Sequence, residues 1–358
     1  MKKKLLSPAV LILAGGKGER FWPRSREKTP KQLQKVYSSK TLLEETLIRA
    51  RSITGISHIY IGCNAALKKA ILATHKGLTD HNFIVEPEGK NTAPIIALAA
   101  LEMEKRHPGS VQVILSADHF ISTIEDFKKT INTAVASAEE GHLVTLGIRP
   151  TRPETGYGYI ESGKRGKLYF SITSFKEKPD VKQALNYINS GKYYWNSGIF
   201  IWKGSVILSE FESHAPHIMD PIRQADKKGQ KALASAFKKI KSDPVDIAIL
   251  EKSKNIVMVP AEFVWDDVGS WISLERICEK DSNDNVFLGD KKSRFASRNS
   301  SHNVISSSKG LVAMLGVNNL ILVEDGDVLY VASRENAGDI KELLGDLRKN
   351  PALQKYLL

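Results

Sequence analysis

The stretch that decides the fold is Ala9-Val-Leu-Ile-Leu-Ala14, followed directly by Gly15-Gly16-Lys17-Gly18-Glu19-Arg20. Its first half is an apolar run without strict alternation, which predicts a strand buried on both faces of a sheet. The glycines that follow let the backbone turn tightly and present N–H groups to an anion. The stretch therefore predicts a phosphate-binding loop at the carboxyl end of a first parallel strand.

Similar apolar runs alternate with helical patterns through the first half of the chain. Strands are predicted at His58–Gly62, Phe83–Val85, Val111–Ser116 and Leu143–Gly147, and helices at Thr41–Arg51, Ala65–Thr74, Pro94–Arg106 and Ile124–Glu139. This alternation predicts an α/β fold with a Rossmann-like, mainly parallel, mixed sheet flanked by helices. Ligands of such sheets bind beyond the carboxyl ends of the strands.

The pattern changes towards the carboxyl end of the chain. The middle region mixes strands and helices, predicted at Tyr157–Glu161, Ser171–Lys176, Val181–Ser190, Gly198–Trp202 and Lys227–Lys241. From about Asp284, short strands are predicted at His302–Ile305, Leu311–Leu315, Leu320–Val323 and Val328–Ala332, before a helix at Asp339–Arg348. We therefore expect a catalytic domain over residues 1–282 and a small β-rich, β-helix-like domain over residues 283–358. No internal repeat is long enough to be recognised.

Composition narrows the class of protein. The chain has 358 residues, of which 42% are hydrophobic and 26% charged, as in ordinary globular proteins. Two cysteines are too few for a disulfide framework, so a reducing, cytoplasmic location is expected. Lys2–Lys4 and the apolar run after them superficially resemble a signal peptide, but Ser7-Pro8 interrupts that run, so we expect none.

The net charge of +12 favours an anionic partner without choosing between nucleic acid, a membrane surface and a phosphorylated small molecule. Cations crowd the glycine loop, where Arg20, Arg24, Arg26 and Lys31 follow one another closely. Arginine grips phosphate oxygens in a fork, and lysine acts as a point charge. The loop matches neither the Walker A pattern nor the dinucleotide fingerprint. The simpler interpretation is a solvated basic turn.

Residues 15–32 read G-G-x-G-x-R-x-W-P-x-S-R-x-x-x-P-K-Q, which resembles the signature of the mannose-1-phosphate guanylyltransferases. The resemblance continues through residues 86–94, 116–119, 155–160, 175–179, 195–200 and 265–271, and it covers essentially the whole chain. Some members of this family carry a fused phosphomannose isomerase domain, for which this chain is too short.

The resemblance implies transfer of GMP from GTP to α-D-mannose 1-phosphate, giving GDP-mannose and pyrophosphate. It implies that Arg20 and Lys31 are catalytic and that Asp118 and Asp267 hold Mg²⁺. Carboxylates suit this ion, which takes its remaining ligands from water and phosphates. Each aspartate can also be a simple turn or cap residue. Asp266 is the less suitable neighbour, because it stands one residue off the family pattern.

The remaining site residues are expected to bind the two substrates. For the nucleotide these are Ala14, Gly15, Gly16, Gly18, Glu86, Asn91 and Thr92. A carboxylate such as Glu86 can accept hydrogen bonds from the N1–H and 2-amino groups of guanine, a pair that the other bases lack. Thr92 is equally well interpreted as part of a helix cap. For the sugar phosphate they are Gly158, Glu177, Lys178, Asn196 and Gly198, although an exposed charge pair also explains Glu177 and Lys178.

Three alternatives stay open at this stage. The first is a nucleotidyltransferase that uses another nucleoside triphosphate or hexose 1-phosphate. The second is an inactive relative that binds a nucleotide sugar. The third, nucleic-acid binding, rests on net charge alone and lacks a recognised module. We expect no nucleic-acid or membrane partner, and the sequence leaves a homodimer open.

Overall fold

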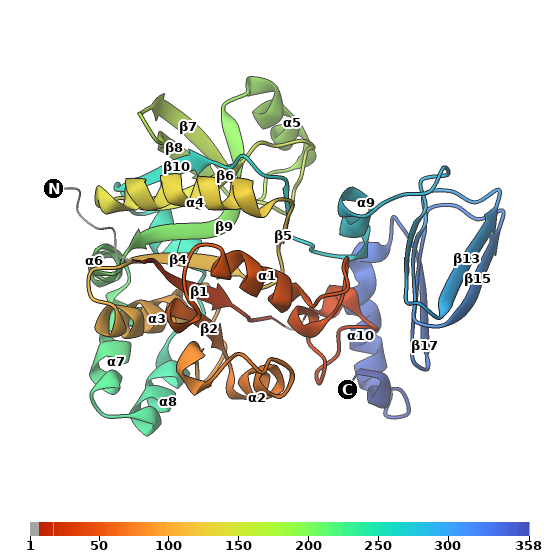
Figure 1. Ribbon diagram of the computed structural model, residues 1–358, viewed down its shortest axis with the longest axis horizontal. Helices are drawn as coiled ribbons and strands as arrows, with labels where there is room; N and C mark the ends of the chain where they lie inside the picture. The colour runs from red at the N-terminus through yellow and green to blue at the C-terminus, as the bar shows by residue number, and fades with distance from the viewer. Residues whose placement is uncertain (1–6, 17, 358) are drawn as a thin grey trace. The chain divides into compact units, whose positions relative to one another are not determined.

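The computed structural model describes residues 7–16 and 18–357 (Figure 1). Lys2–Lys4, on which the signal-peptide question depends, lie outside these residues. The chain forms two compact units. Residues 7–15, 46–117 and 121–265 make up the sheet unit, and residues 16, 18–45, 118–120 and 266–357 make up the β-helix unit. The predicted domain boundary at residue 282 stays a prediction.

The sheet unit is built on nine strands in the order β3-β2-β1-β4-β9-β6-β10-β8-β7. They are β1 (Ala9–Leu13), β2 (Ile59–Cys63), β3 (Phe83–Val85), β4 (Val111–Ser116), β6 (Leu143–Ile148), β7 (Tyr159–Arg165), β8 (Phe170–Lys176), β9 (Tyr193–Lys203) and β10 (Ile256–Pro260). β1 runs parallel to β2 and β4, and β2 runs parallel to β3. β9 is antiparallel to both β4 and β6. The prediction of a mixed α/β sheet is confirmed.

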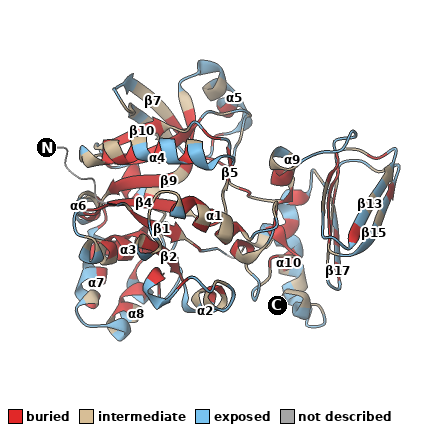
Figure 2. Ribbon diagram, viewed as in Figure 1, coloured by how far each residue is buried: buried red, intermediate tan, exposed pale blue. Residues whose placement is uncertain are grey.

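Both faces of this sheet are covered, which explains the unbroken apolar run of β1. Successive side chains of a strand point to opposite faces. Ala9 and Leu11 pack into one core with the helices α3, α6, α7 and α8, whereas Val10 and Ile12 face the other side, and all four are fully buried. Figure 2 shows β9, near the centre of the sheet, largely in the colour of buried residues. α4 packs along β9, β6 and β10. The helices are α1 (Leu42–Arg51, shared by both units), α2 (Ala65–Thr74), α3 (Thr92–Arg106), α4 (Ile124–Glu139), α5 (Val181–Ser190), α6 (Gly204–His214), α7 (Pro216–Asp226) and α8 (Gln230–Lys239).

The β-helix unit carries the carboxyl-terminal strands and helices. These are β12 (Val286–Gly289), β13 (Ser293–Arg298), β14 (Val304–Ser307), β15 (Gly310–Leu315), β16 (Leu320–Asp325), β17 (Val328–Ser333), α9 (Leu274–Ile277) and α10 (Ile340–Lys349). β12, β14 and β16 stack in parallel, as do β13 and β15, and only β17 turns back antiparallel on β16. The prediction of a β-helix-like extension is confirmed. Among residues 7–16 and 18–357, every helix is too short or too polar to traverse a bilayer.

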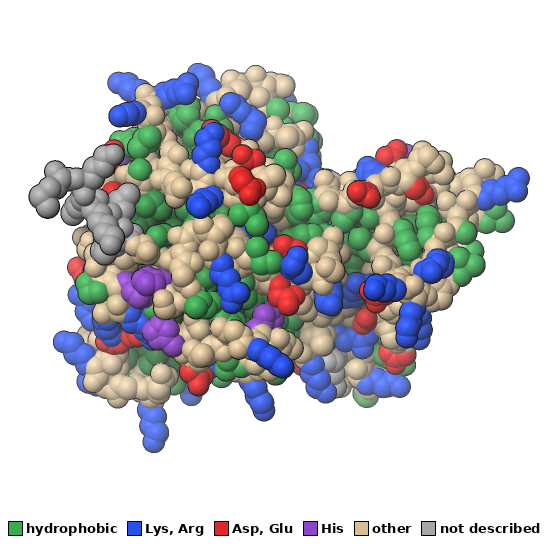
Figure 3. All heavy atoms as spheres, in the orientation of Figure 1, with side chains coloured by type: hydrophobic (Ala, Val, Ile, Leu, Met, Phe, Trp, Pro, Cys, Tyr) green, Lys and Arg blue, Asp and Glu red, His purple; other side chains and the backbone are tan. Residues whose placement is uncertain are grey.

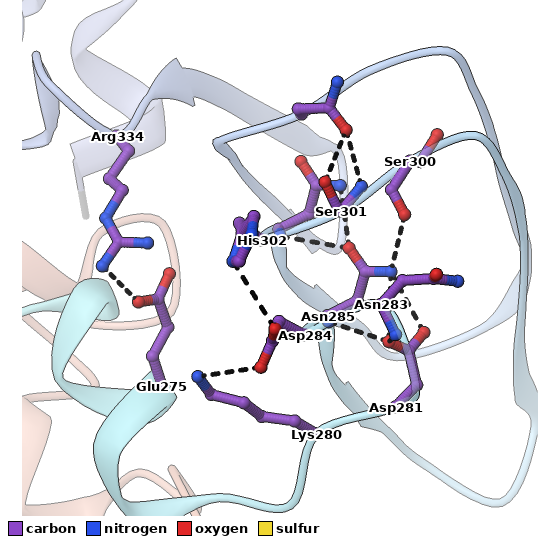
Figure 4. A network of polar contacts seen from close by, with 12 residues as sticks. Glu275, Lys280, Asp281, Asn283, Asp284, Asn285, Ser300, Ser301, His302 and Arg334 are labelled. Atoms are coloured by element: carbon purple, nitrogen blue, oxygen red, sulfur yellow. Dashed lines mark hydrogen bonds and ion pairs between the residues drawn. The ribbon is translucent and has the colours of Figure 1, made fainter.

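A short repeat organises this β-helix, although the sequence shows no repeat long enough to be recognised. The Oδ1 of Asn285 accepts hydrogen bonds from the backbone and side chain of Asn303, 18 residues later. The Oδ1 of Asn303 accepts from the backbone of Leu320, a further 17 residues on. Figure 4 shows Asn285 with its other partners, Asp281 and Ser300. In two successive turns of the β-helix, a buried asparagine oxygen thus accepts a hydrogen bond from the corresponding position of the next turn.

The loop of residues 18–45 is anchored inside the β-helix unit by two tryptophans. The indole N–H of Trp271 donates to the carbonyl oxygen of Trp22 at 3.1 Å, and its ring lies 5.0 Å from that of Phe21. The indole of Trp22 donates in turn to the carbonyl oxygen of Tyr356 at 3.1 Å. The loop thus depends on residues that lie more than half the chain away.

We expect Trp271→Phe to lower the free energy of unfolding by about 1–3 kcal/mol more than Trp202→Phe does, because it leaves the buried Trp22 carbonyl unpaired. Both tryptophans are at most 2% exposed. The indole nitrogen of Trp202 has no hydrogen-bond partner among the described residues, so its replacement removes ring volume and an unpaired N–H but breaks no hydrogen bond. Urea unfolding of both variants measures the difference, and equal losses would mean that the Trp271 hydrogen bond contributes nothing.

Candidate active site

Glycine is required at the centre of the loop. Gly16 and Gly18 adopt φ angles of +90° and +62°, which side chains rarely tolerate. A Cβ atom on Gly18 would lie 2.4 Å from the Cβ of Lys31 and 2.8 Å from the Oγ of Ser25. The loop can therefore close directly over Lys31 only because residue 18 has no side chain. The neighbouring Lys17 lies outside the described residues.

Lys31 is the buried cation of the loop. Its side chain is 7% exposed, and its Nζ lies 2.7 Å from Oδ2 of Asp118, which is 26% exposed. The same ammonium lies 5.0 Å from the ring centre of Phe21, within the range of a cation–π contact. A buried ammonium held by one carboxylate is a preorganised charge, the kind of group that stabilises developing negative charge without reorganisation.

The other three cations of the loop divide into two groups. Arg20, on the short 3₁₀ helix Glu19–Phe21, is exposed to solvent. Arg26 donates to the backbone and carboxylate of Asp325 and to the carbonyl of Pro23. Arg24 donates to the carbonyl of Lys35, and burial lowers its pKa. Arg24 and Arg26 are therefore occupied by contacts within their own unit, whereas Arg20 and Lys31 are the two cations predicted to be catalytic.

Asp266 and Asp267 are adjacent in the sequence but have different surroundings. Asp266 is 2% exposed and takes a two-pronged hydrogen bond from the Arg276 guanidinium, at 2.6 and 3.1 Å. Asp267 is partly exposed and accepts from the backbone of Gly269 at 3.0 Å. Asp266 is thus committed to a structural ion pair, which supports the choice of Asp267 as the metal ligand.

Asp118 and Asp267 belong to the same unit and lie at the same end of a strand pair. The short strands β5 (Phe120–Ile121) and β11 (Trp265–Asp266) are hydrogen-bonded neighbours. The backbone N–H of Ser122, just after β5, donates to the carbonyl of Val264, just before β11, so the two strands run antiparallel. Asp118, before β5, therefore lies next to the end of β11 from which Asp267 follows. Two partly exposed carboxylates at one end of a strand pair fit the oxygen-ligand chemistry of Mg²⁺.

Glu86 lies in the sheet unit, directly after β3. Its residue is 8% exposed, and its Oε2 has no hydrogen-bond partner among the described residues. Burial raises the pKa of this carboxyl to about 7, although a hydrogen bond from the backbone of Lys90 acts in the opposite direction. A buried acceptor without a partner is costly unless a ligand supplies the donor. This arrangement suits the predicted contact with a nucleobase.

Asn91 and Thr92 stand at the start of α3 and have structural contacts. The Oδ1 of Asn91 caps the helix by accepting from the backbone of Thr92 at 2.8 Å. The Oγ1 of Thr92 accepts from the backbone of Val245 at 2.9 Å. The capping interpretation therefore accounts for Asn91, and Thr92 ties α3 to a distant segment. Their role in nucleotide binding stays a prediction.

The predicted sugar-phosphate residues gather in the sheet unit. A Cβ on Gly158 would lie 3.0 Å from Oε2 of Glu177 and 3.8 Å from the Cβ of Asn196, and the carbonyl of Gly158 accepts from the backbone of Asn196. The ammonium of Lys178 lies 2.9 Å from the carboxylate of Glu177. Gly198, at φ +68°, donates its N–H to Oδ1 of Asn196.

Two further polar residues of this group were missed by the sequence analysis. Thr145 on β6 donates its hydroxyl to Oδ1 of Asn196 at 3.1 Å, and Asp246 accepts from Nδ2 of Asn196 at 2.7 Å. Asp246 opens a π-helical turn, Asp246–Leu250, a rare geometry that is frequent at functional sites. Thr145 interrupts an otherwise apolar strand, which was the only local signal for it.

Lys and Arg side chains are spread over the face shown in Figure 3 rather than gathered in one stripe. A continuous basic stripe is what a nucleic-acid backbone requires. This face of the molecule therefore shows no continuous basic surface for a nucleic acid.

Comparison with known proteins identifies what the chain resembles. Residues 9–284 match the nucleotidyl transferase family, and residues 296–347 match the MannoseP isomerase/GMP-like beta-helix domain. A mannose-1-phosphate guanylyltransferase of Escherichia coli is 36% identical, over 95% of this chain and 76% of the relative. One from Salmonella muenchen is 38% identical, over 95% and 73%. A crystal structure described as mannose-1-phosphate geranyltransferase from Thermus thermophilus aligns with a TM-score of 0.89 at 31% identity, over 96% of this chain and all of that one.

Proposed function

Because this chain belongs to the nucleotidyl transferase family, we propose that it transfers GMP from GTP to α-D-mannose 1-phosphate, giving GDP-mannose and pyrophosphate. The names of its relatives support this choice of substrates. The observation that carries the proposal is the buried Lys31 ammonium, which is paired with Asp118 and stands on the glycine loop, where Gly18 packs against the Cβ of Lys31. That arrangement suits a polyanionic substrate.

The chemistry needs positioning and charge more than proton transfer. The attacking group is an oxygen of the sugar phosphate, which is already ionised at neutral pH, so no general base is required. This oxygen attacks the α-phosphorus of GTP in line with the leaving pyrophosphate. Arg20 and Lys31 stabilise the negative charge that builds up on the phosphates, as fixed cations do in phosphoryl transfer.

Asp118 and Asp267 would hold Mg²⁺, with the phosphates completing its ligands. The bound ion would neutralise phosphate charge. Glu177, Lys178 and Asn196 are assigned to the sugar phosphate, with Lys178 on the phosphate and the other two on hydroxyls. Free thiols at Cys63 and Cys278 support a cytoplasmic location.

Base selection is assigned to Glu86. Wild type should prefer GTP over ITP, because ITP lacks the 2-amino group, and Glu86→Gln should narrow that preference by about ten- to a hundredfold in kcat/KM. Because the ionised carboxylate is the acceptor and its pKa is raised to about 7, the KM for GTP should rise as the pH falls below 7. Glu86→Gln should lose that pH dependence.

Steady-state kinetics with both nucleotides between pH 6 and 8.5 test this role. Glu88→Gln is the matched control, because Glu88 lies in the same segment but its side chain is half exposed and paired with Lys90. If Glu86→Gln keeps both the full GTP-over-ITP ratio and the wild-type pH profile, Glu86 does not read the base.

A panel assay tests the proposed substrates. Pyrophosphate release is measured for the four common nucleoside triphosphates, each combined with mannose, glucose and galactose 1-phosphates. The proposal expects GTP with mannose 1-phosphate to give the highest kcat/KM. If a different nucleotide and sugar phosphate give the highest kcat/KM, the chain is a nucleotidyltransferase of different substrate specificity. Binding of GDP-mannose without turnover of any pair would establish an inactive relative.

A further inference from the structure

The Asn196 side chain is held on both sides by buried or half-buried polar groups. Its Oδ1 accepts from the Thr145 hydroxyl at 3.1 Å and from the Gly198 N–H at 3.3 Å, which uses both of its lone pairs. Its Nδ2 donates to Oδ1 of Asp246 at 2.7 Å. Because the Gly198 N–H can only donate, the amide cannot be reversed without losing these bonds. One N–H of Asn196 is left over.

Asp246 is itself fixed from another direction. The segment that leads into it is tied to the start of α3 by three hydrogen bonds. The N–H of Asp243 donates to the carbonyl of Lys90, the N–H of Ala93 donates to the carbonyl of Asp243, and the N–H of Val245 donates to Thr92 Oγ1. The backbone leading into Asp246 is therefore held to the start of α3, although Asp246 itself lies in an irregular turn.

Asp246 also lies within electrostatic reach of the other sugar-phosphate residues. Burial raises the pKa of its carboxyl, and the charge of Glu177 adds to this, while the hydrogen bond from Asn196 and the charge of Lys178 oppose it. The hydrogen bond from Asn196 is therefore one of the contacts that favour the ionised form of this carboxyl.

We propose that Asp246 is a positioning residue that, together with Thr145, fixes the Asn196 amide so that it offers the sugar 1-phosphate one N–H donor and no acceptor. The substrate group that Asn196 meets must then be an acceptor, an oxygen of the sugar or of its phosphate. The inference rests on the proposed function, since it specifies how one of the assigned sugar-phosphate residues is held.

Substitution at Asp246 should raise the KM for only one of the two substrates, which a general loss of folding stability would not do. Asp246→Ala removes the acceptor and frees the Asn196 amide, so the KM for mannose 1-phosphate should rise at least about tenfold, while the KM for GTP stays within threefold of wild type. Asp246→Asn should restore the KM to within about threefold, because its amide oxygen still accepts from Asn196. Thr145→Val should raise the same KM, because it removes a donor to Oδ1.

Thr130→Val is the matched control, since Thr130 is an equally buried threonine on α4 with its own backbone contact to Glu262. It should change neither KM. A wild-type KM for mannose 1-phosphate in both Asp246→Ala and Thr145→Val, or equal rises in both KM values, would overturn the inference. So would an Asp246→Asn variant as impaired as Asp246→Ala. If wild type itself releases no pyrophosphate from the two substrates, the proposed function fails instead.

Discussion

Lys31→Ala is expected to lower kcat by at least about 100-fold, the scale of loss for one preorganised charge stabiliser. The ammonium is buried and held at 2.7 Å from Asp118, and Gly18 packs against the Cβ of the same side chain, so the position of the charge is fixed before substrate binds. No water molecule can replace a fixed positive charge there. We expect Arg20→Ala to have an effect of the same order, because Arg20 is an exposed cation on the same loop.

The matched control is Lys35→Ala, since Lys35 lies four residues after Lys31 but is exposed. It should keep near-wild-type turnover. Stopped-time assays of pyrophosphate release give kcat, and circular dichroism checks that each variant is folded. A folded Lys31→Ala enzyme with at least a third of wild-type kcat would remove Lys31 from the catalytic residues, and the same criterion applies to Arg20.

Removal of divalent metal is expected to abolish activity altogether, and added Mg²⁺ should restore it. Asp118→Asn and Asp267→Asn should each shift the Mg²⁺ titration to higher concentration, because a neutral amide replaces an anionic ligand. Both carboxylates are partly exposed and lie at the same end of the β5–β11 pair. The measurement is activity as a function of free Mg²⁺ after treatment with EDTA.

Asp266→Asn separates metal binding from structure. Asp266 is buried against Arg276, so this variant should lower the melting temperature and leave the Mg²⁺ midpoint unchanged. If Asp118→Asn and Asp267→Asn leave the Mg²⁺ midpoint at its wild-type value, these two residues do not hold the metal. If EDTA does not lower the activity of the wild-type enzyme, the reaction does not need a divalent metal ion.

Local patterns predicted many elements of the sheet unit, although α6, α7 and β10 were not predicted. The limits of α2, α4, α5, β3 and β4 agree with their predictions, because the apolar runs and the residues flanking them are all local signals. Asp180 and Gly191, for example, bracket α5, the first by accepting from the Gln183 N–H and the second by adopting a φ angle of +67°. β9 was predicted too short, because its first half contains polar residues that contact the neighbouring strands and Asp246.

The roles that depend on distant partners could not be predicted. The sequence places Arg26 among the cations of the glycine loop. Its ion pair with Asp325 could not be predicted, because Asp325 lies 299 residues away in the chain. Asp246 carries no local mark of function, because its importance comes from Asn196, 50 residues earlier in the chain.

The repeat of the β-helix was missed for a related reason. The asparagine of the first two turns, Asn285 and Asn303, is replaced by Leu320 in the third. The positive-φ residue that precedes β12, β14 and β16 is Asp284, His302 and Asn319 in turn. Because three different side chains serve one backbone need, the sequence hides the period.

The measurement that tests the central claim most directly is phosphorus NMR of the reaction itself. Wild type is incubated with GTP, mannose 1-phosphate and Mg²⁺, and the phosphorus signals are followed over time. We predict that GTP and mannose 1-phosphate disappear together and that GDP-mannose and pyrophosphate appear in equal amounts. Formation of GDP and inorganic phosphate, or unchanged substrates at saturating concentrations, would contradict the account.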